Sequence, residues 1–200
     1  QGLALLGDPL SGRVRACTAL LQEAFRRKAK LYLVFEYVEK NLLEVLEEKP
    51  AGLDPQTVKL FIYQLVKAIA FCHNSNVIHR DIKSANILIT GRGDFKIADL
   101  GIAVSTSLCN VQGRMRTGKC GTLGYMAPEV SNDLPYDARA DLWSLGCVLY
   151  EIACHRLPFP SGTVVDTGVR VESGISMQAI TEAANMLQLP HAFSDCLNNH

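Results

Sequence analysis

The sequence predicts a mixed α+β domain, because a long amphipathic helix, several short strands and a second, wholly apolar helix follow one another along the chain. Its 200 residues suffice for one ordinary domain, or two small ones, with a substantial core. Apolar residues make up 48% of the chain and charged residues 20%, as in folded proteins rather than disordered ones.

The first element is a β-branched and aromatic run over residues 31–38, which predicts a buried strand ending in a connector. Residues 20–38 as a whole resemble a pair of strands. The basic residues before the run favour a solvated turn over a basic binding patch; they are Arg26, Arg27, Lys28 and Lys30.

A long helix is predicted to begin at Asp54 and Pro55, since Asp caps helix starts and Pro suits the first helical position. Apolar residues then recur at helical spacing up to His73. Three short strand-like pieces follow, with a turn at residues 91–93 between the last two; they are Val77–Ile78, Asn86–Ile89 and Phe95–Ala98.

The region from Thr106 to Gly121 is polar and basic with little periodicity, which predicts a long loop of the kind that is functional or disordered. Residues 141–154 are apolar on all sides of a helical wheel, which predicts a central core helix ended by the prolines at 158 and 160. A weaker amphipathic helix is predicted from Met177 to Leu189.

Charge and cysteine content narrow the partners. Twenty basic residues balance twenty acidic ones, so we expect no nucleic-acid partner and no anionic membrane.

The apolar run Leu142–Tyr150 is far too short to span a bilayer, and the first residues lack the basic region of a signal peptide. Seven cysteines without a Cys-x-x-Cys pair predict reduced thiols and an intracellular location, cytoplasmic or nuclear.

Chemistry is concentrated in His79-Arg-Asp-Ile-Lys-Ser-Ala-Asn86, which lies between the long helix and a short strand, and in Asp99-Leu-Gly101 after the next strand. A nucleoside triphosphate brings Mg²⁺, which prefers carboxylate and amide oxygens. Asn86 and Asp99 can supply such oxygens from two adjacent strand ends. We therefore assign these two residues as metal ligands.

Asp81 and Lys83 complete this hypothesis. A third carboxylate, Asp81, has to lie near the acceptor hydroxyl to orient it and to accept its proton. Lys83 is two residues further on, so an extended backbone directs both side chains to one side. There its charge can stabilise the phosphoryl group in transfer.

An isolated loop Asp is usually a turn former and an isolated His usually a packed core residue, so the order and spacing of motifs carry the argument. Two more motifs follow, Gly121-Thr-Leu-Gly-Tyr-Met-Ala-Pro-Glu129 and Asp141-Leu-Trp-Ser-Leu-Gly146. Together the four resemble the protein kinase family over about residues 20–160. The resemblance implies a protein-kinase-like α+β fold with a mainly helical C-lobe and a reduced N-lobe.

The resemblance also implies ATP and Mg²⁺ as cofactors and protein Ser/Thr hydroxyls as substrates, because Lys83 and the Gly121-Thr122 pair look like the Ser/Thr class. Residues 31–46 look most like cyclin-dependent-kinase-like enzymes, whereas the catalytic and activation segments look more like NIMA-related or Ste20-like kinases. The adenine pocket would take Phe35 as gatekeeper, Glu36 to Val38 as hinge and Leu88 as floor.

Regulation is implied by Arg80, which in the family pairs with a phosphate on the activation loop. Thr117 is the candidate phosphosite, with an unmodified loop threonine as the alternative. Leu100 replaces the usual Phe of Asp-Phe-Gly and can fill the same apolar position. A regulatory partner is compatible with the resemblance but is not identified by it.

The ends of the chain depart from the family. Gly7, Gly12 and Val14 resemble its Gly-rich, ATP-binding loop, but Pro9 stands where the middle Gly belongs, and a plain turn fits equally well. Only 21 residues separate Val14 from Glu36, whereas the intervening strands and helix need about 30.

No lysine or helix glutamate of the usual N-lobe ion pair can therefore be placed, and Lys28 or Lys30 are weak substitutes. We divide the chain into an N-lobe remnant at 1–38, a C-lobe at 39–160 and an unassigned tail at 161–200. Two hypotheses follow: a Ser/Thr protein kinase, or a catalytically impaired kinase-like fragment or pseudokinase that acts as a binding or scaffold module. A small-molecule phosphotransferase is disfavoured by the Ala-Pro-Glu segment.

Overall fold

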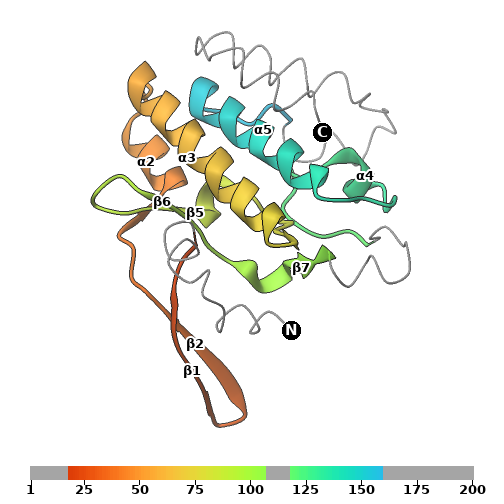
Figure 1. The fold of residues 1–200 in the computed structure, drawn as a ribbon. Helices are drawn as coiled ribbons and strands as arrows, with labels where there is room; N and C mark the ends of the chain where they lie inside the picture. Colours follow the sequence, from red (N-terminus) through yellow and green to blue (C-terminus); the bar gives the residue numbers. More distant parts are fainter. Residues whose placement is uncertain (1–17, 107–117, 160–200) are drawn as a thin grey trace.

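The computed structural model describes residues 18–106 and 118–159. In these residues a helical body with short strands carries a two-stranded hairpin that projects from one end (Figure 1). The elements in chain order are β1 (Leu21–Arg27), β2 (Lys30–Phe35), β3 (Lys40–Asn41), α2 (Leu42–Glu48), α3 (Pro55–Asn74), β4 (Val77–Ile78), β5 (Ile87–Ile89), β6 (Phe95–Ile97), β7 (Val104–Ser105), α4 (Pro128–Ser131) and α5 (Arg139–Cys154). Short 3₁₀ turns at Ser84–Asn86 and Leu100–Ile102 complete the set.

The body is built around α3 and α5, which lie side by side (Figure 1). Asp54 caps α3 by accepting the backbone N–H groups of Gln56 and Thr57, as its position before Pro55 predicts. The predicted apolar stripe of α3 is buried, with Leu65 fully inaccessible. The prediction of α5 as a central core helix is confirmed, since its buried residues surround the axis.

Three short strands pack beside α2 and α3. β3, β5 and β6 form an antiparallel sheet in that order, in which Leu88 lies opposite both Asn41 and Lys96. The predicted strand pieces are all present, and the turn between β5 and β6 contains Gly93 with a φ of 83°. Helix α2 was not predicted, although Asn41 and Glu44 form the reciprocal capping box that marks its start.

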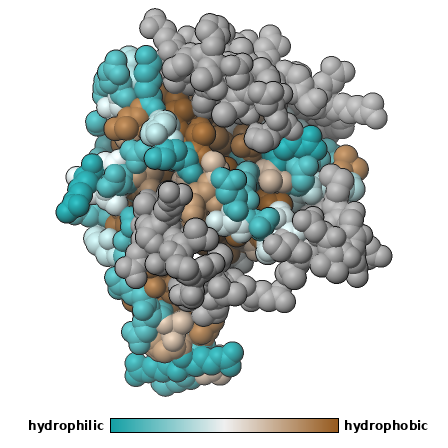
Figure 2. Space-filling view, viewed as in Figure 1, coloured by the Kyte–Doolittle hydropathy of each residue, from teal (hydrophilic) through white to brown (hydrophobic). Residues whose placement is uncertain are grey.

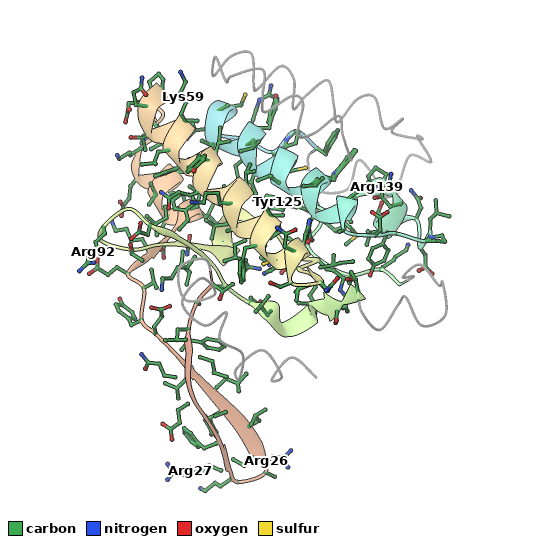
Figure 3. The ribbon with its side chains drawn as sticks, viewed as in Figure 1. Arg26, Arg27, Lys59, Arg92, Tyr125 and Arg139 are labelled. Atoms are coloured by element: carbon green, nitrogen blue, oxygen red, sulfur yellow. The ribbon has the colours of Figure 1, made fainter. Side chains whose placement is uncertain are left out.

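The hairpin of β1 and β2 confirms the predicted strand pair. Its two-residue turn, Lys28 and Ala29, has φ angles of 47° and 61°, the left-handed geometry that suits tight hairpins. Arg26 and Arg27 lie at its far end, so the basic residues do surround a solvated turn (Figure 3).

Burial of the second strand, however, was predicted wrongly. β2 stops at Phe35, and its apolar side chains stay exposed, Leu31 by 54%, Leu33 by 46% and Phe35 by 47%. Figure 2 shows the apolar side chains along the projecting hairpin and hydrophilic ones at its end. The reason is that the β-branched and aromatic pattern needs a covering layer, and none of the described residues covers the hairpin.

Candidate active site

The loop that carries the candidate catalytic residues is held by one buried carboxylate of α5. Asp141 is 1% exposed, and its two oxygens accept the backbone N–H groups of His79 and Arg80, each at 2.8 Å. Nε2 of His73, on α3, lies 2.9 Å from the same carboxylate. These three contacts fix the backbone just before Asp81, where Arg80 has a φ of 72°.

His79 is a packed core histidine and not a catalytic one, as is usual for an isolated His. Its side chain is inaccessible, and its Nε2 lies 3.0 Å from the carbonyl oxygen of Ala98. Burial lowers its pKa, although Asp141 and other acidic groups act in the opposite direction. The ring is therefore neutral near pH 7 and serves to join the loop to the strand that precedes Asp99.

The sequence-predicted residues Asp81, Lys83 and Asn86 meet in one cluster. Lys83 adopts an extended backbone, as predicted, and its Nζ lies 2.9 Å from Oδ2 of Asp81. Nδ2 of Asn86 donates to Oδ2 and to the backbone carbonyl of Asp81, at 3.0 and 2.9 Å. The short 3₁₀ turn at Ser84–Asn86 brings Asn86 back to Asp81, five residues earlier in the chain.

Thr122 joins this cluster from the segment after the long loop. Its hydroxyl donates to Oδ1 of Asp81 at 2.6 Å and accepts from Nζ of Lys83 at 2.9 Å. Gly121 permits this approach, because its φ is 100° and a Cβ there would lie 2.6 Å from the carbonyl oxygen of Arg80. The Gly121-Thr122 motif predicts the Ser/Thr class but not the contact of Thr122 with Asp81.

These contacts set the charge of Asp81. Burial by itself would raise the pKa of the carboxyl, but hydrogen bonds from Thr122, Lys83 and Asn86 and the charge of Lys83 outweigh it, so the pKa lies below its ordinary value. Asp81 is therefore ionised at neutral pH. An ionised carboxylate beside an ammonium group can accept a proton from a hydroxyl that reaches it.

The two predicted metal ligands lie on neighbouring backbone segments. The N–H of Ala98 donates to the carbonyl of Asn86 at 2.8 Å, which sets Asn86 beside the residue that precedes Asp99. Asp99 is exposed and has a φ of 62°, and its side chain accepts the N–H of Gly101 at 3.2 Å.

The donor chemistry at this place fits Mg²⁺. Asn86 uses its amide nitrogen toward Asp81, which leaves its amide oxygen as the atom for a cation. The described residues contain no group of three His, Cys, Asp or Glu side chains able to hold a metal ion by themselves. One carboxylate and one amide oxygen suit Mg²⁺ that is also held by phosphates, which is its usual mode beside nucleotides.

The predicted adenine-pocket residues come from three elements. Glu36 and Val38 are partly buried in the connector after β2, and Leu88 is partly buried in β5. Oε1 of Glu36 accepts Nζ of Lys96 at 2.6 Å, and Lys96 lies directly opposite Leu88 in the β5–β6 pair. The structure therefore brings the connector next to Leu88, whereas Phe35 is largely exposed. Gly7, Gly12 and Val14 lie outside the described residues.

The segment around Tyr125 is anchored in the body. Its hydroxyl donates to Oε2 of Glu151 at 2.7 Å and lies 3.0 Å from the hydroxyl of Ser84, while its carbonyl accepts from Ser144 at 2.8 Å. Sequence reasoning quoted Tyr125 within its motif but missed this buried network. The sequence feature that indicates this network is the presence of polar residues, Ser144 and Glu151, on a helix that is otherwise apolar on all sides.

Comparison with known proteins decides the family. The chain matches the protein kinase domain over residues 18–197, which includes every contact described above. It belongs to the protein kinase family. The α+β kinase fold implied by the sequence motifs is thereby confirmed.

Among curated relatives, the kinase chain is 47% identical over 146 residues to the human and mouse proteins called cyclin-dependent kinase-like 5. It is 37% identical over 147 residues to the human cyclin-dependent kinase-like 2. Each match covers 73% of this chain but only 15% and 29% of those relatives. These relatives support the cyclin-dependent-kinase-like resemblance, while the NIMA-related or Ste20-like likeness of the activation segment gains no support.

The structure also places the two candidate lysines of the hairpin and Arg80. Lys28 lies in the turn of the hairpin and Lys30 begins β2, and among the described residues neither forms an ion pair. Nε of Arg80 donates to the carbonyl of Ile102 at 2.6 Å and its Nη1 to the hydroxyl of Tyr136 at 2.9 Å. Thr117, the predicted phosphosite, lies outside the described residues.

Proposed function

We propose that this chain carries the phosphoryl-transfer site of a Ser/Thr protein kinase, which moves the γ-phosphoryl group of ATP to a protein Ser or Thr hydroxyl. The observation that carries this is the cluster in which Asp81, Lys83, Asn86 and Thr122 meet within hydrogen-bonding distance. Its acceptor carboxylate, ammonium group and amide oxygen are the three kinds of group that this reaction requires.

Each residue has a separate part in the proposal. Asp81, ionised at neutral pH, orients the acceptor hydroxyl and takes its proton as the hydroxyl oxygen bonds to the γ-phosphorus. The bond from that phosphorus to the bridging oxygen breaks at the same time, and ADP leaves with the bonding electrons. Lys83, within 2.9 Å of Asp81, places a positive charge where negative charge increases. Asn86 and Asp99 would hold Mg²⁺, which neutralises charge on the phosphates when bound. The connector from Glu36 to Val38, with Leu88, would hold adenine.

The alternative is a kinase-like binding module with impaired catalysis. It is favoured by the two candidate lysines, which lie at the exposed hairpin turn and, within residues 18–106 and 118–159, pair with no glutamate. The match covers only 15% of the length of cyclin-dependent kinase-like 5. The activity, the substrates and any regulatory partner of the whole protein are therefore proposed and not shown.

We also propose an intracellular location. Among the described cysteines, Cys120, Cys147 and Cys154 carry free thiols, as expected in a reducing compartment. No helix in the described part of the chain combines the length and apolarity needed to cross a membrane.

The test is transfer of labelled γ-phosphate from Mg·ATP to a generic basic protein, followed by identification of the phosphorylated amino acid. Asp81→Asn and Asp99→Ala should each lower transfer by at least about a hundredfold. Asp94→Ala, an exposed carboxylate in the β5–β6 turn, is the matched control and should retain full activity. Absence of transfer from the folded parent chain would favour the binding module, and label on tyrosine would refute the Ser/Thr assignment.

A further inference from the structure

One carboxylate, that of Glu36, lies at the base of the hairpin and has partners on both sides. Oε1 of Glu36 accepts the backbone N–H of Leu20 at 2.7 Å and Nζ of Lys96 at 2.6 Å. Leu20 immediately precedes β1 and Glu36 immediately follows β2, and the N–H of Glu36 donates to the carbonyl of Leu20 at 2.9 Å. One side chain therefore joins both ends of the hairpin to β6 of the body.

This ion pair is shielded from water. The side chains of Lys96 and Glu36 are 13% and 23% exposed. Burial by itself would raise the pKa of Glu36, but the hydrogen bonds from Lys96 and Leu20 outweigh it and the pKa lies below its ordinary value. The carboxylate is thus ionised at neutral pH, and its charge-assisted bonds are of the strong, little-screened kind.

Lys96 lies between the predicted adenine-pocket residues and the predicted metal ligand Asp99. It lies opposite Leu88, so the two side chains share one face of the sheet. It is also three residues before Asp99, on the strand that leads to that residue. A second contact also joins the start of the hairpin to β6, because the N–H of Ala19 donates to the carbonyl of Ile97 at 3.0 Å.

We propose that Lys96 is a positioning residue. It acts through Glu36 and holds the connector 36–38 and the hairpin in a fixed position relative to Leu88 and Asp99. Adenine bound at the connector is thereby kept at a fixed offset from phosphates held near Asp99. The effect on nucleotides rests on the proposed function, whereas the placement of the connector does not.

Hydrogen exchange on the full chain tests the placement. In Lys96→Met, exchange at the amides of Leu20 and Glu36 and along β1 and β2 should rise roughly tenfold, with amides of α3 unchanged. Lys96→Arg should restore the parent rates. Lys40→Met is the matched control, because Lys40 and Glu48 form an ion pair of equal length, 2.6 Å, that is exposed on the body and does not touch the hairpin. Unchanged exchange in Lys96→Met would overturn the proposal.

Nucleotide binding gives a second, independent readout. The Kd for Mg·ATP should rise about tenfold in Lys96→Met and Glu36→Gln, while the Kd for Mg²⁺ with inorganic triphosphate, which has no adenine, should stay within twofold. Equal losses for both ligands would mean general loosening and would overturn the positioning role. If the parent chain binds neither ligand, the proposed function fails, and the exchange experiment alone decides whether Lys96 places the connector.

Discussion

The body and the hairpin of this kinase contrast in how their side chains are used. In the body, buried polar groups such as Asp141 and Tyr125 each have several partners, and apolar side chains are enclosed between α3 and α5. In the hairpin, the apolar side chains of β2 are exposed, and its position depends on contacts at its base. The body therefore has its own core, whereas the hairpin takes its placement from the body.

Removing the Asp141 carboxylate should have the largest effect on the body. Asp141→Ala leaves the N–H groups of His79 and Arg80 without an acceptor, at about 1–3 kcal/mol each, so the free energy of unfolding should fall by about 2–6 kcal/mol. Urea denaturation followed by circular dichroism measures this. Asp141→Asn keeps one acceptor oxygen and should lose about half as much. A loss no larger than that of the exposed control Asp94→Ala would contradict the anchoring role.

The same substitution in both regions sharpens the contrast. Leu65→Ala, at a fully buried site of α3, should lower the free energy of unfolding by about 2–5 kcal/mol. Leu33→Ala, at a site of β2 that is 46% exposed, should change it by no more than about 0.5 kcal/mol. Urea denaturation of the two variants side by side is the measurement. Comparable losses would show that the hairpin is covered in solution.

A smaller, pH-dependent effect is expected at Glu151. Burial raises the pKa of this carboxyl above its ordinary value, although the hydrogen bond from Tyr125 opposes the shift. As the pH rises past the ordinary pKa of a Glu carboxyl, Glu151 ionises in the unfolded chain before it ionises in the folded one. The free energy of unfolding therefore falls progressively until the pH has passed the folded-state pKa of Glu151.

Glu151→Gln removes that dependence while keeping an acceptor for Tyr125. The two proteins should agree within about 1 kcal/mol near pH 4, and the variant should gain on the parent as the pH approaches about 8. Urea denaturation across this range is the check, with the exposed Glu47→Gln as control. A stability difference that does not change with pH would contradict the raised pKa.

The sequence predicted the body better than the hairpin for a physical reason. Helical periodicity in α3 and apolarity all round α5 report burial directly, because those helices cover one another. The apolar pattern of β2 reports a need for burial that no other described element meets, so strand pairing was predicted correctly and burial was not.

The candidate site divides in the same way. Local spacing was enough to group Asp81, Lys83 and Asn86, because an extended dipeptide and a single 3₁₀ turn separate them. Contacts across long sequence separations were missed, among them Thr122 with Asp81 and Lys96 with Glu36. Nothing in the local pattern around Lys96 distinguishes it from a surface lysine on a short strand.

The hydroxyl of Thr122 already occupies Oδ1 of Asp81, and Lys83 and Asn86 share Oδ2. Under the proposed function, an acceptor hydroxyl that reaches this carboxylate exchanges one alcohol for another, and the number of hydrogen bonds to the carboxylate stays constant. Such an exchange is close to thermoneutral, and water, which is also a hydroxyl donor, can make it equally well. Discrimination between a protein side chain and solvent then has to arise from the shape of the surrounding surface, not from the carboxylate.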